Sequence, residues 1–166
     1  EIDLGDTVST IGGSFAFTDA GEDSDGYVVF LVTRDPVYLL QQHYMPIHFT
    51  ISRTTWTIDV WNNGTMTTVL SGSFSPSLAA NTDYYAQARI SGNAIYAELP
   101  DGTTRVARHA YVATNGGNWA DMELFANTAS TATKPTYSEF WADTRPVDAM
   151  ELPGVGFFPT DAQLVN

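Results

Sequence analysis

The chain has 166 residues, enough for one domain with one core, and 16% of them are charged, against about 25% in a typical soluble protein. With 43% hydrophobic residues the composition excludes a disordered tail or a coiled coil, and a formal charge of -12 excludes the basic surface that nucleic-acid binding needs. The absence of cysteine excludes disulfides and cysteine-ligated metals, and no apolar run reaches the roughly 20 residues of a membrane span, so we expect no membrane insertion.

Hydrophobic and polar residues alternate through most of the chain, which predicts antiparallel strands that are half buried. The first predicted strand, 27–32, does not alternate. It is apolar throughout, as expected for a central strand covered on both faces. Alternating strands follow at 47–52, 56–61, 84–90, 95–99 and 119–124. Sequences typical of tight turns separate several of them, namely Asn63-Gly64, Ser91-Gly92-Asn93 and Pro100-Asp101-Gly102.

This spacing of about 8 to 12 residues predicts an all-β fold, an antiparallel two-sheet β-sandwich or jelly roll of about ten to twelve strands with minimal helix. We expect the sandwich to comprise residues 1–145. Residues 146–166 form a C-terminal tail that contains proline and glycine. Phe157 and Phe158 indicate that this tail packs on the domain or leads to a neighbouring domain or subunit.

The outward side of the middle strands is the first candidate site. If the alternation holds, eight side chains share one face of one sheet: His48, Asp59, Trp61, Tyr85, Gln87, Arg89, Tyr96 and Glu98. Aromatic rings stack on the CH-rich faces of sugars, and planar Asp, Gln and Arg groups hydrogen-bond their hydroxyls, so this face predicts carbohydrate binding. The alternative is an ordinary solvated sheet face, in which Arg89 pairs with Glu98.

A second candidate site is the loop Asn115-Gly116-Gly117-Asn118-Trp119, where two glycines free the backbone beside an indole. Asn115, Asn118 and Trp119 would be its ligand-binding side chains. A tight connection between strands needs the same glycines, so a purely structural loop is the alternative.

Four acidic residues gather before the first predicted strand, as in a calcium-binding loop: Asp19, Glu22, Asp23 and Asp25. The loop departs from the EF-hand template, because Gly21 stands at the first ligand position and Val32 at the position of the closing glutamate. We therefore expect weak calcium binding at most, with a solvated acidic loop as the alternative, and no other cofactor.

Paired carboxylates are what a glycoside-cleaving enzyme would need. Asp121 and Glu123 stand two residues apart on a predicted strand, about 7 Å, and Glu98 is a third candidate. Glu1 and Asp3 form a similar pair at the terminus. A two-residue spacing arises often by chance, and the sequence shows no Ser, His and Asp set and no phosphate-binding loop. We therefore predict a protein without catalytic activity.

Several segments between Ile47 and Trp141 carry a resemblance to a known superfamily. They are Ile47-His48-Phe49-Thr50-Ile51, Trp56-Thr57-Ile58-Asp59-Val60-Trp61, Leu70-Ser71-Gly72-Ser73-Phe74, Ser77-Leu78, Asp83-Tyr84-Tyr85, Leu99-Pro100-Asp101-Gly102-Thr103 and Glu139-Phe140-Trp141-Ala142. This run resembles the concanavalin A-like lectin/glucanase superfamily, and within it the jelly-roll domains of tail proteins from phages of actinobacteria. The glucanases of the superfamily carry a Glu-x-Asp-x-(x)-Glu strand in mid-chain, whereas the similar letters here lie at residues 1–6 and end in Asp6.

The resemblance implies a non-catalytic module of a phage tail, or of another extracellular protein, that binds a host cell-surface glycan as its receptor. A homo-oligomer such as a trimer, and contacts to other virion proteins, would fit that setting. Two alternatives stay open. One is a structural virion domain that decorates a capsid or spaces a tail through protein contacts, and the other is a glucanase-like enzyme that cleaves glycans.

Overall fold

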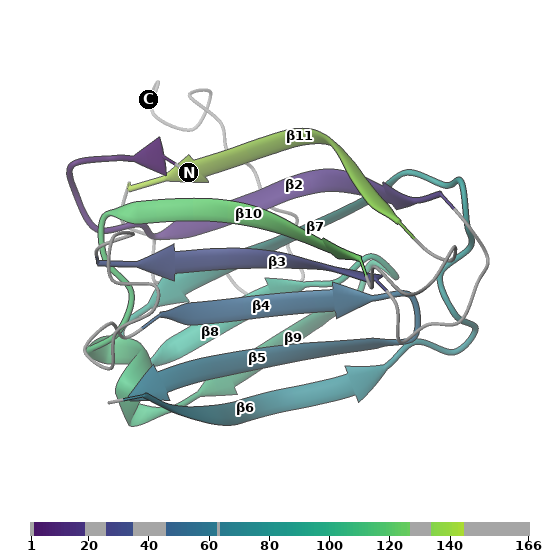
Figure 1. Ribbon diagram of the computed structural model, residues 1–166. Coiled ribbons are helices and arrows are strands. Elements are labelled where there is room, and N and C mark those ends of the chain that lie inside the picture. The colour runs from purple at the N-terminus through teal and green to yellow at the C-terminus, as the bar shows by residue number, and fades with distance from the viewer. Residues whose placement is uncertain (1, 19–25, 35–45, 63, 127–133, 145–166) are drawn as a thin grey trace, which may run out of the picture.

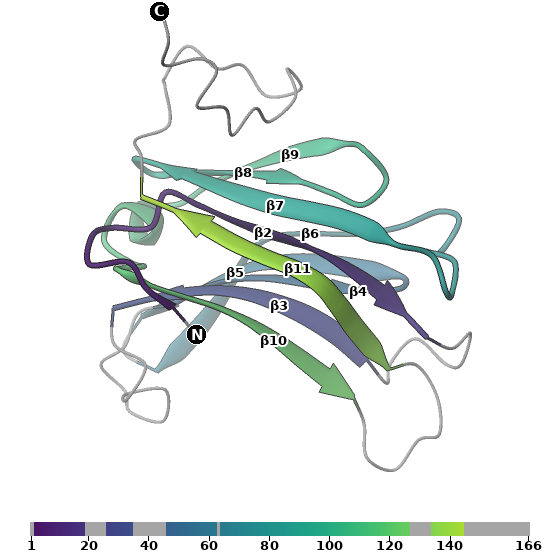
Figure 2. The same ribbon diagram turned by 90° about the horizontal axis from the view of Figure 1, so that it is seen from above.

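Two antiparallel β-sheets pack face to face in the computed structural model, which describes residues 2–18, 26–34, 46–62, 64–126 and 134–144 (Figures 1 and 2). The six-stranded sheet has the order β1-β10-β3-β4-β5-β6 and the five-stranded sheet the order β11-β2-β7-β8-β9. These strands, six in one sheet and five in the other, confirm the predicted jelly-roll sandwich of ten to twelve strands.

The strands of the six-stranded sheet are β1 (Ile2–Asp3), β3 (Gly26–Thr33), β4 (Ile47–Ser52), β5 (Thr55–Asn62), β6 (Thr65–Ser73) and β10 (Trp119–Ala126). Those of the other sheet are β2 (Thr10–Phe17), β7 (Tyr84–Ser91), β8 (Ala94–Glu98), β9 (Thr104–Arg108) and β11 (Pro135–Asp143). Within the described ranges the helical content is a single 3-10 turn, η3 (Ala110–Ala113), which confirms the expected scarcity of helix.

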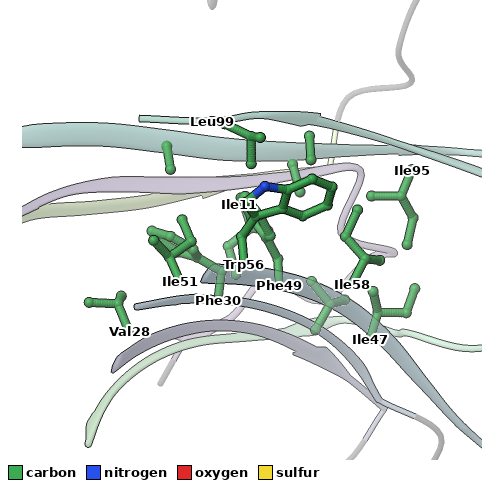
Figure 3. Close-up of a cluster of buried hydrophobic side chains, with 14 of the residues drawn as sticks. Ile11, Val28, Phe30, Ile47, Phe49, Ile51, Trp56, Ile58, Ile95 and Leu99 are labelled. Carbon is green, nitrogen blue, oxygen red and sulfur yellow. The ribbon is translucent and has the colours of Figure 1, made fainter. Parts of the chain in front are cut away.

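The core lies between the sheets, and the alternation seen in the sequence decides which side chains enter it (Figure 3). Phe49 of β4 and Ile58 of β5 point inward and are buried, and their register partners continue the apolar layer across the sheet. Phe30 of β3 stacks with Phe49 at 5.9 Å between ring centroids, and it meets Phe15 of β2 edge-on at 6.3 Å. These aromatic contacts join the two sheets and fix their inner faces.

Five strands were not predicted individually: β1 has only two residues, and each of the other four carries a weak alternation signal. β2 contains Gly12 and Gly13, β6 consists mostly of threonine and serine at the sheet edge, β9 is a short edge strand, and β11 is interrupted by a bulge between Tyr137 and Glu139. The predicted C-terminal tail, 146–166, lies outside the described residues, as does Asn63 of the first predicted turn.

The six-stranded sheet is bent, and its outward face is the concave one. In Figure 3 its ribbons arch toward the core side chains, so the opposite side of the sheet curves inward. Figure 1 shows β10, β3, β4, β5 and β6 side by side in front of the other sheet. This outward face is therefore formed by the residues that alternate with the core positions on those strands.

Candidate functional site

The eight residues expected to share one face lie on both outer sides of the sandwich, so this part of the prediction is wrong. His48, Asp59 and Trp61 belong to β4 and β5 in the six-stranded sheet. The other five, Tyr85, Gln87, Arg89, Tyr96 and Glu98, belong to β7 and β8 in the five-stranded sheet. Alternation correctly assigned each of them to an outward side, but it carries no information about which sheet a strand joins.

On the six-stranded sheet, His48 lies directly opposite Asp59 on the neighbouring strand. The Asp59 carboxylate is buried at 5% exposure and accepts two hydroxyl hydrogen bonds, from Thr57 at 2.7 Å and from Thr68 at 2.6 Å. These two threonines fix the carboxylate between β5 and β6. The imidazole also lies beside the Trp61 indole, with 6.0 Å between ring centroids.

Burial lowers the pKa of His48 from 6.5 to about 4, and the negative charge of Asp59 opposes this shift. Desolvation prevails because a partly enclosed imidazole loses more hydration energy on protonation than the neighbouring carboxylate returns. His48 is therefore neutral at physiological pH, and each ring nitrogen is then either a donor or an acceptor.

Among the described residues, three buried polar atoms on this side of the sheet have no hydrogen-bond partner: Thr33 Oγ1, His48 Nε2 and Trp61 Nε1. They belong to the adjacent strands β3, β4 and β5, which places them within about 10 Å of one another across the sheet. An unpartnered buried polar group costs roughly 1–3 kcal/mol, and native structures retain few of them. Such a group of atoms is therefore a site where a ligand could supply the missing partners.

Two carboxylates extend this face on β10. Asp121 and Glu123 alternate with Met122, which packs on the core, so both acids lie on the outward side of the strand. Asp121 lies opposite Leu31, and Glu123 opposite Val29. The third expected carboxylate, Glu98, lies on the opposite side of the sandwich and does not join them, which corrects that prediction.

Residues 115–119 were expected to form a second binding site. In the structure, the two asparagines of this loop hold neighbouring strands in place. Asn115 Nδ2 donates to the backbone carbonyl of Trp61 at 2.6 Å, and Asn118 Nδ2 donates to Asp3 Oδ1 at 2.8 Å. Trp119 begins β10 and lies opposite Thr33 at the edge of the outward face. Asn115 therefore supports the strand that carries Trp61, and Asp3 is bound by the loop, while Glu1, its predicted partner, lies outside the described residues.

Gly117 in this loop is required by a close approach. A Cβ atom built at this position would lie 2.5 Å from the Arg34 Cα and 2.6 Å from the Thr33 carbonyl oxygen. No other residue fits there without a backbone shift. The glycine thus allows the loop to pass against the end of β3, beside the outward face.

On the five-stranded sheet, the predicted residues form a network among themselves. Gln87 is 0% exposed and its Nε2 donates to Glu98 at 3.3 Å, although its Oε1 has no partner. The guanidinium of Arg89 lies 5.8 Å from the centroid of the Tyr96 ring. Burial and the charge of Glu98 raise the pKa of Tyr85 to about 12, despite hydrogen bonds from Gln87 and Trp141 that lower it.

Trp141 was not predicted as part of any site. Its indole can lie where it does because Gly12 has no side chain. A Cβ at Gly12 would lie 2.9 Å from the Trp141 ring and 2.5 Å from the Gln87 Cβ. The indole therefore lies over β2 and against Gln87, and this leaves the Gln87 amide enclosed. We conclude that packing over Gly12 explains the position of Trp141 on this side.

Thr33, Tyr27 and Phe125 are further residues of the concave face that the sequence prediction did not include. All three face outward on β3 or β10, with Tyr27 opposite Phe125 in the register. Segment 27–32 is apolar on both faces and does not alternate, so its residues do not indicate which side faces solvent.

A pocket of about 210 Å³ lies beside the loop 115–119, and Val8, Ile90, Val112 and Gly116 contribute to its lining. Ligand pockets commonly have about 300–1,000 Å³, so this one is smaller than a sugar chain needs. The concave face is the better candidate.

No group of three or more His, Asp or Glu side chains in the described ranges is placed to hold a metal ion. The predicted calcium ligands, Asp19, Glu22, Asp23 and Asp25, lie outside those ranges. In the same described portion, no helix has the length and apolar character required to pass through a membrane.

Comparison with known proteins finds relatives by structure alone, since no protein-family model and no curated protein sequence matches the chain. A Bacillus licheniformis β-glucanase is 14% identical with a TM-score of 0.54, over 84% of this chain and 67% of that one. A homodimeric agglutinin from chicken liver, CG-16, is 7% identical with a TM-score of 0.54, over 86% and 97%. Chicken galectin 2 is 9% identical with a TM-score of 0.51, over 86% and 96%. The fold is thus the jelly-roll sandwich of galectins and β-glucanases, as the resemblance implied.

Proposed function

We propose that this domain binds a neutral glycan on the concave outward face of its six-stranded sheet. The observation that carries the proposal is the group of three unpartnered buried atoms, Thr33 Oγ1, His48 Nε2 and Trp61 Nε1, beside the Trp61 ring. Sugar hydroxyls both donate and accept hydrogen bonds, so one ring could satisfy these atoms while its CH-rich face packs on the indole. Galectin and agglutinin folds among the structural relatives support the proposal.

The charge of this face indicates a neutral ligand. Asp59, Asp121 and Glu123 are its ionisable acids, and the described outward residues of β3, β4, β5 and β10 include no lysine or arginine. Carboxylates accept hydrogen bonds from sugar hydroxyls, but they repel uronate, sulfate and sialate groups. With a formal charge of -12 on the chain, this repulsion extends beyond the site.

The unpartnered atoms have almost no exposed surface. A ligand therefore reaches them only by displacing the groups around them, and association that requires such a rearrangement is slower than rigid docking.

The experiment is a glycan array followed by calorimetry, with Trp61→Ala and Tyr96→Ala as matched variants. Both substitutions remove a partly buried, outward-facing aromatic ring, but the two rings lie on opposite sides of the sandwich. We expect neutral glycans to bind, Trp61→Ala to weaken binding at least about fivefold, and Tyr96→Ala to leave it unchanged. Equal losses in both variants, or wild-type binding only to anionic glycans, would contradict the proposal.

Glycan cleavage is a second candidate, favoured by the position of Asp121 and Glu123 side by side on the same face. Their spacing along β10, about 7 Å, lies within the range of about 5–9.5 Å for glycoside hydrolysis, whereas Asp59 is about 14 Å from Asp121 across three strand spacings. We propose a non-catalytic module and expect no release of reducing ends from neutral β-glucans. Sustained release that Glu123→Gln abolishes, with the fold intact, would establish the enzyme instead.

We also propose that the glycan belongs to a host cell surface and that the domain is part of a phage tail or another extracellular protein. Only the family resemblance of the run from Ile47 to Trp141 supports this setting. The homodimeric agglutinin among the structural relatives supports self-association. Binding to actinobacterial cell walls, and light scattering of the purified chain, test the two statements separately.

A further inference from the structure

An exposed aromatic pair lies on the same concave face, distant from Trp61. The rings of Tyr27 on β3 and Phe125 on β10 are stacked, with 4.8 Å between centroids and an interplanar angle of 18°. They are 37% and 41% exposed, which places both among the exposed large hydrophobic side chains of the described residues. The pair therefore presents an apolar platform to solvent.

The platform and the unpartnered atoms lie toward opposite ends of the strands in the six-stranded sheet. Tyr27 stands six residues before Thr33 on β3, which corresponds to about 20 Å along the strand. Phe125 likewise stands six residues after Trp119 on β10. Figure 1 shows both strands crossing the full width of the sheet side by side. A ligand that touches both ends must therefore span this distance.

Two carboxylates of β10 lie between the two ends. Glu123 lies in the row next to Phe125, opposite Val29, and Asp121 lies in the following row, opposite Leu31. Both carboxylates are partly exposed, whereas Val29 and Leu31 are buried, so a ligand would follow β10 between the two ends. Carboxylates accept hydroxyl hydrogen bonds, so sugar rings on this path would be held by Asp121 and Glu123.

We propose that Tyr27 and Phe125 form a second sugar subsite, so that the ligand is an extended neutral oligosaccharide or polysaccharide chain of several rings rather than a mono- or disaccharide. The inference rests on the proposed glycan binding and adds the ligand's length and its second contact. A cross-strand aromatic pair can also stabilise a sheet. If that were its only role, removing a ring would lower the free energy of unfolding but would not change how affinity depends on chain length.

The test is calorimetry with graded series of neutral glucan, mannan and galactan oligosaccharides, from about two to eight rings, using Tyr27→Ala, Phe125→Ala and Tyr137→Ala. Tyr137 is the control, because it is 60% exposed but lies on β11 of the other sheet. We expect wild-type affinity to rise with chain length, and each platform variant to lose about 3- to 10-fold with long chains only. Tyr137→Ala should change nothing.

Stability is measured in parallel, and Tyr27→Leu replaces Tyr27→Ala if the latter fails to fold, since leucine keeps an apolar contact for Phe125 without the ring. The second subsite would be overturned if affinity did not depend on chain length and neither platform variant changed it. If Trp61→Ala still weakened binding in that case, the proposed function would stand. Absence of wild-type binding to all three series and to the array would overturn both.

Discussion

The neutral state of His48 predicts how the free energy of unfolding depends on pH. Its pKa is about 4 in the folded protein, because burial outweighs the charge of Asp59, and 6.5 in the unfolded chain. Between these values the unfolded chain binds the extra proton, so the free energy of unfolding decreases as the pH falls. Above about pH 6.5 both states are neutral and the effect vanishes.

The magnitude follows from the two pKa values. Each pH unit in this window is worth about 1.4 kcal/mol, so lowering the pH from about 6.5 to 5 costs about 2 kcal/mol through this one side chain. His48→Gln removes the titration and retains a polar side chain. The wild type should thus lose about 2 kcal/mol more than the variant between about pH 7.5 and 5.

Urea unfolding at these two pH values, followed by tryptophan fluorescence, measures the difference. His109→Gln is the matched control for the loss of a histidine, because His109 lies at the start of η3 and accepts a hydrogen bond there from the Tyr111 backbone N–H. A histidine resonance that disappears in His48→Gln and titrates near pH 6.5 in the folded wild type would refute the reasoning, as would equal pH dependence in the wild type and His48→Gln.

Three further outcomes are expected. Gly117→Ala should destabilise the domain by about 1–3 kcal/mol in thermal unfolding, because its Cβ would lie 2.5 Å from the Arg34 Cα; an unchanged melting temperature would show that the loop shifts freely. Phe49→Ala should cost about 3–5 kcal/mol, since the ring is buried between the sheets, and a loss below about 1 kcal/mol in urea would contradict that packing. Asp59→Asn should lower the pKa of His48 further, because it removes the charge that opposes desolvation; an NMR titration showing a rise would contradict this.

The inward and outward sides of strands could be predicted from sequence because they depend on local alternation. Trp56, Ile58 and Val60 are buried as expected, while Trp61 lies on the outward side. The pairing of strands depends on contacts far apart in the chain. β7 follows β6 in sequence but joins β2 in the other sheet, and this single step separated Tyr85 from Trp61.

The aromatic platform was missed for a different physical reason. Strand β3 buries Val29 and Leu31 on its outward side as well as Phe30 on its inward side, so its sequence shows no period. An exposed Tyr27 at the end of such a run looks like one more core residue. Only the register with β10, which places Phe125 opposite, reveals that the two rings stack in solvent.

The two outer faces carry similar residue types, and their hydrogen bonding distinguishes them. On the five-stranded sheet the Gln87 amide is enclosed beneath Trp141 and donates to Glu98, so its one unpartnered atom, Oε1, lies within a packed network. On the six-stranded sheet the unpartnered atoms come from three strands, and His48 lies in one row with Asp59 and Asp121. Packing against neighbouring side chains accounts for Gln87 and Trp141 on the first face. The second face has polar atoms that the described residues leave unpartnered, and a ligand rich in hydroxyls would complete their hydrogen bonds.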